Sequence, residues 1–352
     1  MKNSDGLTLE AVRNYYGRVL ASTKDLQTSA CCAIEKLAPH LAAIEAQLHD
    51  EVKDKFYGCG APLPPALDGA TVLDLGCGSG RDTFMLSRLV GERGQVIGID
   101  MTPEQLAVAE EHLDYHRRQW GYARGNVRLV SGYIEDLRGA GIESGSVDLV
   151  VSNCVVNLSP DKERVFAEVF RVLKPGGELY FSDVFASRRV PAPLAEDPVL
   201  LGECLGGALY WEDFRRIMAR VGCADHRVVS KRDLTLDNPD IARQIGQIGF
   251  SSVTVRAFKL ALEDRCEDYG QVATYLGTID DSPHHFVLDD HHDFEAGRPM
   301  LVCGNSAAMV QETRYARHFR VTGDRSTHFG LFDCGPATGA PATAKSDGSS
   351  CC

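Results

Sequence analysis

The sequence predicts an α/β protein whose central sheet is mostly parallel. Between residues 70 and 260, short apolar runs alternate with segments in which apolar side chains recur at helical spacing. Glycine and proline stand at several of the junctions, where they end helices and form tight turns. Strands that alternate with helices form a parallel sheet covered on both faces. With 352 residues and 44% hydrophobic residues, the chain is long enough for such a core and for further units.

The expected elements of this sheet follow one another along the chain. Strands are expected at residues 71–75, 95–100, 126–132, 146–153 and 177–185, helices at 81–91, 102–119 and 211–222, and two final β-rich runs at 226–236 and 251–260. The first helix places Phe84 and Leu89 on one side and stops at Gly91. The second begins with Thr102 as its cap, Pro103 at its first helical position and Gln105 three residues after the cap.

The chain is expected to divide into four parts. They are an N-terminal helical segment at 1–69, the α/β domain at 70–262, a small C-terminal α/β domain at 263–335 and a disordered tail at 336–352. The tail has too few large apolar residues to pack. The small domain is expected to contain a helix at 306–319 and to serve as a lid or packing domain. Its Cys303 and Cys334 are interpreted as structural.

Charge and composition exclude several classes of protein. The net charge is −12, and no run of lysine or arginine is present, which argues against a nucleic-acid partner. The N-terminus lacks the apolar core of a signal peptide, and no window approaches the roughly 18 apolar residues that span a bilayer. No membrane partner is therefore expected, and the cytoplasm is the expected compartment.

The chain has twelve cysteines, which are expected to be reduced in that compartment. No paired C-x-x-C unit of a zinc site occurs, and the nearest spacings are the vicinal pairs Cys31-Cys32 and Cys351-Cys352. The histidine pairs at 284–285 and 291–292 lie in an acidic stretch and are interpreted as a solvated loop. A single free cysteine is usually a buried, inert thiol, so only position marks one as functional.

A glycine turn after the first strand predicts a nucleoside site. In DLGCGSG, Asp74 precedes Gly76, Gly78 and Gly80, which allow the backbone to approach a ligand closely. Asp100 follows Gly80 by 20 residues, at the end of the next strand, where a carboxylate can hold ribose hydroxyls. The G-x-G-x-G spacing resembles the first motif of class I methyltransferases, which use S-adenosylmethionine (SAM).

Two cysteines occupy positions expected to face that cofactor. The fourth strand ends in SNCVVN, so Cys154 stands at the opening of the sheet. Asn153 beside it is either a turn residue or a ligand of the amino-acid portion of SAM. Cys204 lies in GECLGGALYW, interpreted as a lid in which Gly206-Gly207 allows close backbone approach. Upstream, YGCG places Tyr57 and Cys59 just before the domain.

Nine phrases together give a specific resemblance. They are LQTSAC, FYGCG, DLGCGSGRD, GIDMT, EEHLDYH, GYIEDL, VVSNCVVNL, LKPGGELYFSDV and GECLGGALYWEDF. The chain resembles the arsenic(III) SAM methyltransferases, the arsenite methyltransferase family, over most of residues 10–335. The resemblance implies a class I SAM-methyltransferase fold, which is Rossmann-like, and an enzyme that methylates trivalent arsenic.

The resemblance also implies roles for particular residues. The cofactor contacts that it implies are Asp100 on the ribose, Met101 beside the adenine, Ile134 and Glu135 closing on the adenine ring, and Tyr57 near the SAM methyl. Cys59, Cys154 and Cys204 correspond to arsenic ligands, and Cys31 to a cysteine of the thiol-disulfide steps. Cys32 departs from the family pattern, so either Cys31 or Cys32 is the acting thiol.

The implied chemistry suits these residues. Trivalent arsenic is soft and prefers soft thiolate ligands. Arsenite and methylarsenite, as thiol conjugates, are the expected substrates, and an external thiol reductant such as glutathione or thioredoxin is the expected source of electrons. We expect Cys31 or Cys32 to close a disulfide with Cys59. Two alternatives remain at this point: a thiol-rich metalloid-binding protein without catalysis, and a SAM methyltransferase for another small acceptor.

Overall fold

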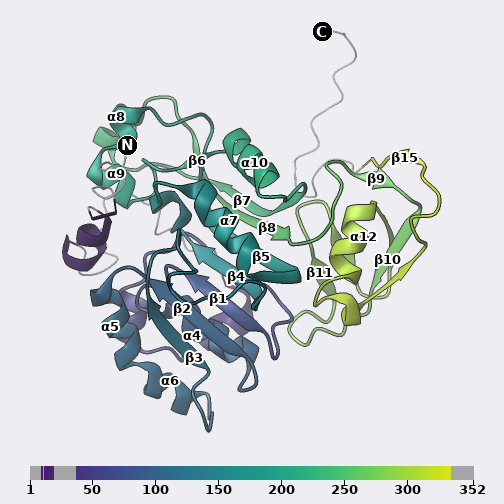
Figure 1. Cartoon of the computed structure of the whole chain (residues 1–352), viewed down its shortest axis with the longest axis horizontal. Coiled ribbons are helices and arrows are strands. Elements are labelled where there is room, and N and C mark those ends of the chain that lie inside the picture. Colours follow the sequence, from purple (N-terminus) through teal and green to yellow (C-terminus); the bar gives the residue numbers. More distant parts are fainter. Residues whose placement is uncertain (1–8, 11, 20–36, 334–352) are drawn as a thin grey trace.

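The computed structural model describes residues 9–10, 12–19 and 37–333. In Figure 1 these residues form a large α/β body and a smaller body to one side of it, built from the part of the chain that follows β8. Five cysteines singled out in the sequence lie outside the described residues: Cys31, Cys32, Cys334, Cys351 and Cys352. The same holds for the expected tail at 336–352.

One eight-stranded sheet forms the centre of the large body. Its strands are β1 (Thr71–Leu75), β2 (Gln95–Asp100), β3 (Val127–Ser131), β4 (Val147–Asn153), β5 (Leu173–Ala186), β6 (Leu209–Tyr210), β7 (His226–Asp233) and β8 (Phe250–Phe258). The order is β3-β2-β1-β4-β5-β8-β7, with β6 beside β5. Strands β1 to β5 pair in parallel, and β8 runs antiparallel to both neighbours. The predicted, mostly parallel α/β fold is confirmed.

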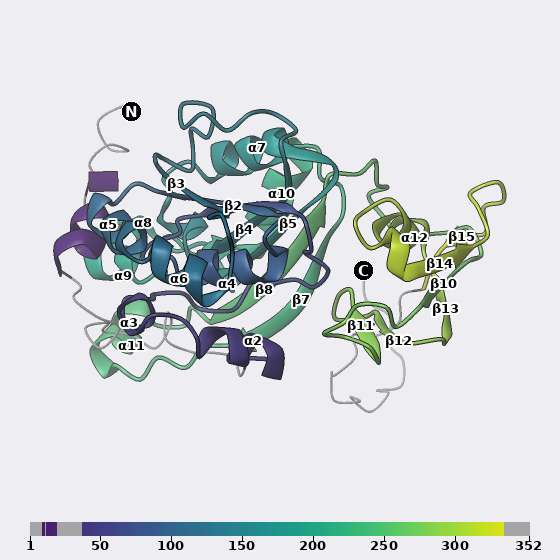
Figure 2. The ribbon, with the colours of Figure 1, turned by 90° about the horizontal axis from the view of Figure 1, so that it is seen from below.

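Helices cover both faces of this sheet, as Figure 2 shows. The helical elements of the large body are η1 (Tyr15–Val19), α2 (Pro39–Glu45), α3 (Asp50–Asp54), α4 (Arg81–Val90), α5 (Pro103–Glu111), α6 (Leu113–Gln119), η3 (Val156–Leu158), α7 (Lys162–Val172), α8 (Ala192–Ala195), α9 (Pro198–Gly202), α10 (Trp211–Arg220) and α11 (Pro239–Ile245). Leu73 of β1 packs with Phe166 of α7 and Phe214 of α10, whereas Val72 packs with Phe84 of α4 on the opposite face. Neighbouring strand residues thus bury apolar side chains on both faces, as a parallel sheet requires.

The structure corrects the single helix expected over 102–119. It is divided into α5 and α6 at His112, whose backbone angles are φ −100° and ψ 6°. The His112 side chain makes two contacts at the break: its Nε2 lies 3.0 Å from Glu51 Oε2, and its ring stacks on that of His49. These contacts join the break to the N-terminus of α3, which a helical periodicity cannot indicate.

The smaller body surrounds its own apolar cluster, which includes Phe258, Phe286, Phe294 and Phe319. Its elements are β9 (Glu267–Asp268), β10 (Gln271–Tyr275), β11 (His285–Val287), β12 (Asp293–Glu295), β13 (Pro299–Val302), α12 (Gly304–Gln311), η4 (Ala316–His318), β14 (Phe319–Thr322) and β15 (Gly330–Leu331). The helix expected over 306–319 is therefore shorter and begins two residues earlier. Throughout the described ranges, every helix is too short or too polar to cross a membrane.

Candidate active site

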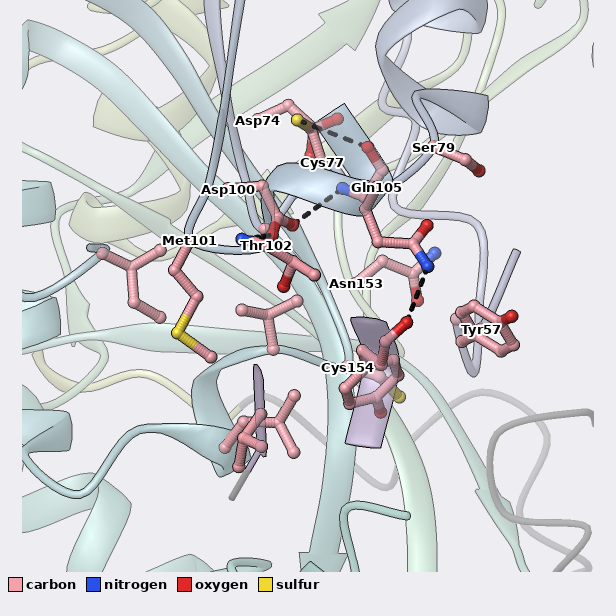
Figure 3. Close-up of a pocket in the computed structure, with 18 of the residues that line it drawn as sticks. Tyr57, Asp74, Cys77, Ser79, Asp100, Met101, Thr102, Gln105, Asn153 and Cys154 are labelled. Atoms are coloured by element: carbon pink, nitrogen blue, oxygen red, sulfur yellow. Dashed lines mark hydrogen bonds between the residues drawn. The ribbon is translucent and has the colours of Figure 1, made fainter. Parts of the chain in front are cut away.

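A pocket opens at the carboxyl ends of β1, β2 and β4, with about 910 Å³ of empty space that includes its mouth to solvent. Most of the residues predicted to bind cofactor line it: Tyr57, Asp74, Gly76, Gly78, Asp100, Met101, Ile134, Glu135 and Asn153. Figure 3 shows several of these side chains, together with Cys154, around one cavity. The remaining predicted residue, Gly80, caps the start of α4 instead of lining the cavity.

The glycine turn brings backbone to the pocket surface. Gly76, Gly78 and Gly80 all have positive φ (66°, 52° and 93°), a conformation that side chains disfavour. A Cβ on Gly76 would lie 2.4 Å from Val155, and one on Gly80 would lie 2.8 Å from Phe84. A Cβ on Gly78 would meet little except the cavity itself. The turn is therefore a cradle that brings the backbone close to any ligand that occupies the cavity.

Asp100 is held at the end of β2 by backbone donors. Its Oδ2 accepts from the N–H of Gly78 at 2.9 Å, and its Oδ1 accepts from that of Thr102 at 2.8 Å. Each oxygen keeps a second lone pair, so the carboxylate can also accept from the two hydroxyls of a ribose. Burial raises the pKa of Asp100, which the backbone donors partly offset.

The pocket is rich in carboxylates. Asp74 and Asp82 line it with Asp100, and Arg81 is the basic residue paired with Asp82, at 2.6 Å. The pKa of Asp74 is raised well above its ordinary value, first by burial and then by the negative charges of Asp82 and Asp100. A cationic ligand would relieve this crowding of like charges. SAM, with its sulfonium and ammonium groups, is such a ligand.

Gln105 also lines the cavity, although the sequence did not predict it as a cofactor contact. Its Nε2 donates to the backbone carbonyl of Tyr16 at 3.0 Å, while its Oε1 is buried without a hydrogen-bond partner in the described part of the chain. A buried acceptor of this kind carries an energetic cost that a ligand donor would remove. Gln105 was predicted only as a helix-capping residue after Thr102, and the capping pattern gave no signal of a second use.

Asn153 fastens the segment that carries Cys59 to the end of β4. Its Oδ1 accepts from the N–H groups of Cys59 (3.0 Å) and Gly60 (3.2 Å), and its Nδ2 donates to the carbonyl of Gly60 (2.9 Å) and to Asp82 (2.7 Å). These four bonds use the full capacity of an asparagine amide. Asn153 faces the cavity, but its polar atoms are engaged by protein.

Three cysteines distant in sequence meet beside this pocket. Cys59 and Cys154 form a disulfide across a separation of 95 residues. The sulfurs of Cys154 and Cys204 and a carboxylate oxygen of Asp183 lie within 4.8 Å of one another. Cys154 lines the cofactor cavity, whereas Cys59 and Cys204 are only 1% and 0% exposed behind it. The predicted convergence of the three sulfurs is therefore present, with two of them oxidised.

Backbone strain is concentrated at two of these cysteines. Cys154 and Cys204 have φ of 57° and 64°, and Ala66 is the one other non-glycine residue with positive φ in the described ranges. Strain of this kind costs of order 1–3 kcal/mol and persists only where the surrounding structure holds the backbone in place. The thiol of Cys204 donates to the carbonyl of Cys154 at 3.1 Å, which holds the two strained turns together.

The predicted lid around Cys204 packs closely on the sheet opening. A Cβ on Gly207 would lie 1.9 Å from the carbonyl oxygen of Asn157, so the close approach expected for Gly206-Gly207 is confirmed. The N-terminal segment holds the same lid from the other side. Tyr15 donates to Glu203 at 3.1 Å, and Tyr16 donates to the carbonyl of Gly202 at 2.6 Å.

Two ionisable groups that were not predicted lie next to the cysteines: Asp183, which is buried, and Lys162, which is partly buried. Asp183 accepts from the backbone and side chain of Asn157 and from its neighbour Val184. Burial raises its pKa to about 7, against the effect of these donors. Burial also lowers the pKa of Lys162, which is partly offset by Asp183, Cys204 and Glu135. Asp183 lies in mid-strand, in FSDVF, where an alternating pattern marks it only as a buried position.

The strand order, the glycine cradle and the acid at the end of β2 define a SAM-dependent methyltransferase of class I. A family model described as a methyltransferase domain matches residues 66–222. An arsenite methyltransferase of Aquipseudomonas alcaligenes is 53% identical over 93% of this chain and 94% of its own length, and the human arsenite methyltransferase is 42% identical over 88% and 82%. The chain belongs to the arsenite methyltransferase family.

A solved structure supports the same assignment. The crystal structure of an arsenic(III) S-adenosylmethionine methyltransferase from Chlamydomonas reinhardtii has a TM-score of 0.82 to this chain and 50% sequence identity. The match covers 84% of this chain and 100% of the chain in that crystal structure. The likeness therefore extends beyond the methyltransferase domain into the smaller body.

Proposed function

We propose that this protein transfers the methyl group of SAM to trivalent arsenic held by Cys59, Cys154 and Cys204. The observation that carries the proposal is the convergence of these three sulfurs at the end of β4, next to the nucleoside pocket. Three thiolates suit a soft trivalent centre and exclude water from it. Mono-, di- and possibly trimethylated products follow from repeated transfer, which amounts to arsenic detoxification.

The cofactor roles in this proposal fall to residues that line one cavity. Asp100 accepts from the ribose, Met101, Ile134 and Glu135 flank the adenine, and Tyr57 lies toward the methyl group. The Gly76–Gly80 turn, Asp74 and Gln105 complete the cradle. Bound there, SAM supplies an electrophilic methyl group on a cationic sulfur, which the carboxylates of the pocket favour.

Arsenic needs no catalytic base in this arrangement. When it is bound to three thiolates, it keeps a lone pair and carries no proton, so the protein contributes position. Fixing reacting groups in this way is worth effective molarities of about 10⁵ M or more. The burial of Cys59 and Cys204 keeps solvent from the reacting face. Residues 263–335 serve in this proposal as a small C-terminal lid or packing domain.

The disulfide gives the redox half of the proposal. Transfer of a methyl cation to the lone pair raises arsenic from the +3 to the +5 state, and two thiolates return it to +3 by giving up two electrons as they join in a disulfide. Cys59–Cys154 is such a disulfide. An external thiol such as glutathione or thioredoxin reopens it by exchange, which implies a reducing compartment, the cytoplasm. Cys31 or Cys32 is proposed to close a disulfide with Cys59 in this step, and both cysteines lie outside the described residues.

The test is direct. Purified protein is incubated with arsenite, SAM and a thiol reductant, and the arsenic species are separated and quantified. We expect methylated arsenic from the wild type and less than about 1% of that rate from Cys154→Ser and Cys204→Ser, because a two-sulfur site leaves arsenic hydrated and misplaced. Cys223→Ser, which alters a buried thiol outside the site, is the matched control. Full arsenic methylation by both active-site variants would mean that Cys154 and Cys204 do not hold the arsenic, and no methylated arsenic from the wild type would mean that another small molecule is the acceptor.

A further inference from the structure

A second pair of cysteines lies in contact away from the active site. Cys266 precedes β9 and is partly exposed, and Cys303 immediately precedes α12 and is fully buried. The segment that carries Cys266 lies against the start of α12, since the Glu263 N–H donates to the Asn305 side chain at 3.0 Å and the Tyr269 ring packs on Gly304. This places the side chain of Cys266 within reach of that of Cys303. Sequence analysis interpreted Cys303 as a structural thiol and gave Cys266 no role. Because 37 residues separate the two, their contact depends on the fold of the smaller body.

Donors surround the sulfur of Cys303. It accepts from the backbone N–H of Ser306 at 3.4 Å and lies 3.3 Å from the Ser306 hydroxyl, at the N-terminus of an eight-residue helix. Arg227 of β7 reaches across from the large body, and its Nη2 donates to the same sulfur at 3.8 Å. The Ser306 hydroxyl also meets His292 at 3.3 Å. The site therefore favours an anionic sulfur.

Other buried thiols in the chain have the opposite surroundings. Burial raises the pKa of Cys223 to about 12 and raises that of Cys77 well above its ordinary value. For Cys303 the pKa is lowered to about 5, first by the hydrogen bond from Cys266 and then, against burial, by Arg227 and Ser306. A cysteine that only filled space in the hydrophobic core would not need a second thiol, an arginine and a serine directed at its sulfur.

We propose that Cys266 and Cys303 form a second arsenical-binding site, a dithiol that binds monosubstituted trivalent arsenicals of the form R–As(OH)₂. Two adjacent sulfurs can replace both hydroxyls while the carbon substituent remains. Cys266 is the point of entry because it is partly exposed, and Cys303 closes the chelate. The site belongs to the boundary between the two bodies, since Arg227 comes from β7 whereas both cysteines come from the smaller body.

The binding step is a ligand exchange without redox change. Two As–S bonds form, two As–O bonds break, and each displaced hydroxide leaves as water with the proton of the thiol that replaces it. A sulfur that is already a thiolate releases hydroxide in place of water. Arsenic stays trivalent, so no oxidant or reductant is consumed. Because the site has two sulfurs, it prefers monosubstituted arsenicals to arsenite. Arsenite would keep one hydroxyl here, whereas both hydroxyls of a monosubstituted arsenical are replaced by sulfur.

The dithiol chemistry does not depend on catalysis, but one part of the inference rests on the proposed function. If the enzyme methylates arsenite, its monomethylated trivalent product is the physiological ligand of this site. A dithiol would then hold a reactive intermediate on the protein between rounds of methylation. The binding test below uses no SAM, so its failure would leave the proposed methylation untouched.

The experiment measures arsenic stoichiometry with phenylarsine oxide, whose hydrated form is an R–As(OH)₂. The parent is the full chain with Cys59, Cys154 and Cys204 replaced by serine and all remaining cysteines reduced. After incubation with the probe, the protein is dialysed against a monothiol, which strips single-sulfur adducts but leaves chelates, because closing the second bond strengthens binding by about 10²–10⁴-fold. Arsenic and protein are then quantified.

We expect Cys266→Ser and Cys303→Ser each to lower the stoichiometry of the parent by one arsenic per chain. Serine at 303 still caps α12, so this variant should fold. Cys223→Ser is the matched control and should leave the value unchanged. The vicinal pairs Cys31-Cys32 and Cys351-Cys352 contribute equally to all variants. An unchanged stoichiometry in either Cys266→Ser or Cys303→Ser, with the folded state verified by circular dichroism, would overturn the site.

Discussion

Asn153 donates a hydrogen bond of 2.7 Å to Asp82 while it holds the backbone of Cys59 through its own oxygen. One amide thereby links the cofactor pocket to the segment that carries Cys59, the first of the three proposed arsenic ligands. Asp82 is fixed in turn by Arg81, which also contacts Glu45 and lies over the ring of Phe56. The position of Cys59 is thus set by groups that line the SAM site.

This relationship predicts the effect of Asn153→Ala. The N–H groups of Cys59 and Gly60 lose their acceptor, at a cost of about 1–3 kcal/mol. We expect the KM for arsenite to rise at least about 10-fold, with SAM affinity changed less than two-fold. Kinetics and SAM titration measure the two effects. Asn126→Ala, which alters another buried amide network on Ser87 and Gly91, is the control for lost stability. Equal losses of SAM and arsenite binding would make Asn153 a cofactor ligand.

The disulfide predicts a requirement for prior reduction. While Cys59 and Cys154 are bonded to each other, neither sulfur can bind arsenic. We expect protein purified without reductant to bind SAM but not arsenite, and treatment with a phosphine reductant that is then removed to restore arsenite binding. Equilibrium dialysis with each ligand measures both. Arsenite binding of equal strength before and after reduction, with the disulfide verified by mass spectrometry, would contradict the prediction.

The sequence predicted the sheet and its cofactor edge well, because both depend on local patterns. Apolar runs located β1 to β5, and the glycine turn with Asp100 located the nucleoside pocket. The break at His112, the orphan acceptor of Gln105 and the contact between Cys266 and Cys303 were not predictable in this way. Each depends on which distant side chain the fold brings near, and a single sequence carries no periodic signal for that.

Strain at Cys204 predicts an ordering of stabilities. With φ at 64°, the residue adopts a backbone conformation that glycine accepts and other residues resist by about 1–2 kcal/mol. We therefore expect Cys204→Gly to unfold at higher urea than Cys204→Ala, by about 1 kcal/mol in the free energy of unfolding. Both variants lack the Cys204 sulfur and should be inactive. The difference in their free energies of unfolding therefore does not come from loss of the sulfur. An alanine variant as stable as the glycine variant would show that the turn relaxes without cost.

The contact of the lid with η3 predicts that Gly207 tolerates no side chain. A Cβ there would lie 1.9 Å from the carbonyl of Asn157, so backbone has to move and Cys204 moves with it. We expect Gly207→Ala to lower methylation at least about 10-fold, since displacements of about 1 Å cost up to 10²-fold. Gly125→Ala, where the nearest atom is 4.0 Å away, is the matched control and should stay active. Arsenic speciation measures both.

His116 predicts a pH dependence of stability. Its ring stacks on Phe84, its Nδ1 donates to the carbonyl of His112 at 2.8 Å, and its Nε2 accepts from the N–H of His49 at 3.3 Å. Burial lowers its pKa from 6.5 to about 4, so the folded protein keeps the ring neutral. Between these two values the unfolded chain binds the extra proton and the folded chain does not.

The stability that His116 provides is therefore full above pH 6.5 and is lost as the pH falls toward 4. Between pH 6.5 and 4.5 we expect the free energy of unfolding to fall less in His116→Gln than in the wild type, by at least about 1 kcal/mol. Urea unfolding at pH 4.5, 5.5, 6.5 and 8 measures the profile, and the difference at pH 8, where the ring is neutral in both states, gives the cost of lost contacts. Parallel profiles across the whole range would mean that His116 is protonated in the folded protein, and its hydrogen bond from His49 would then have to be absent.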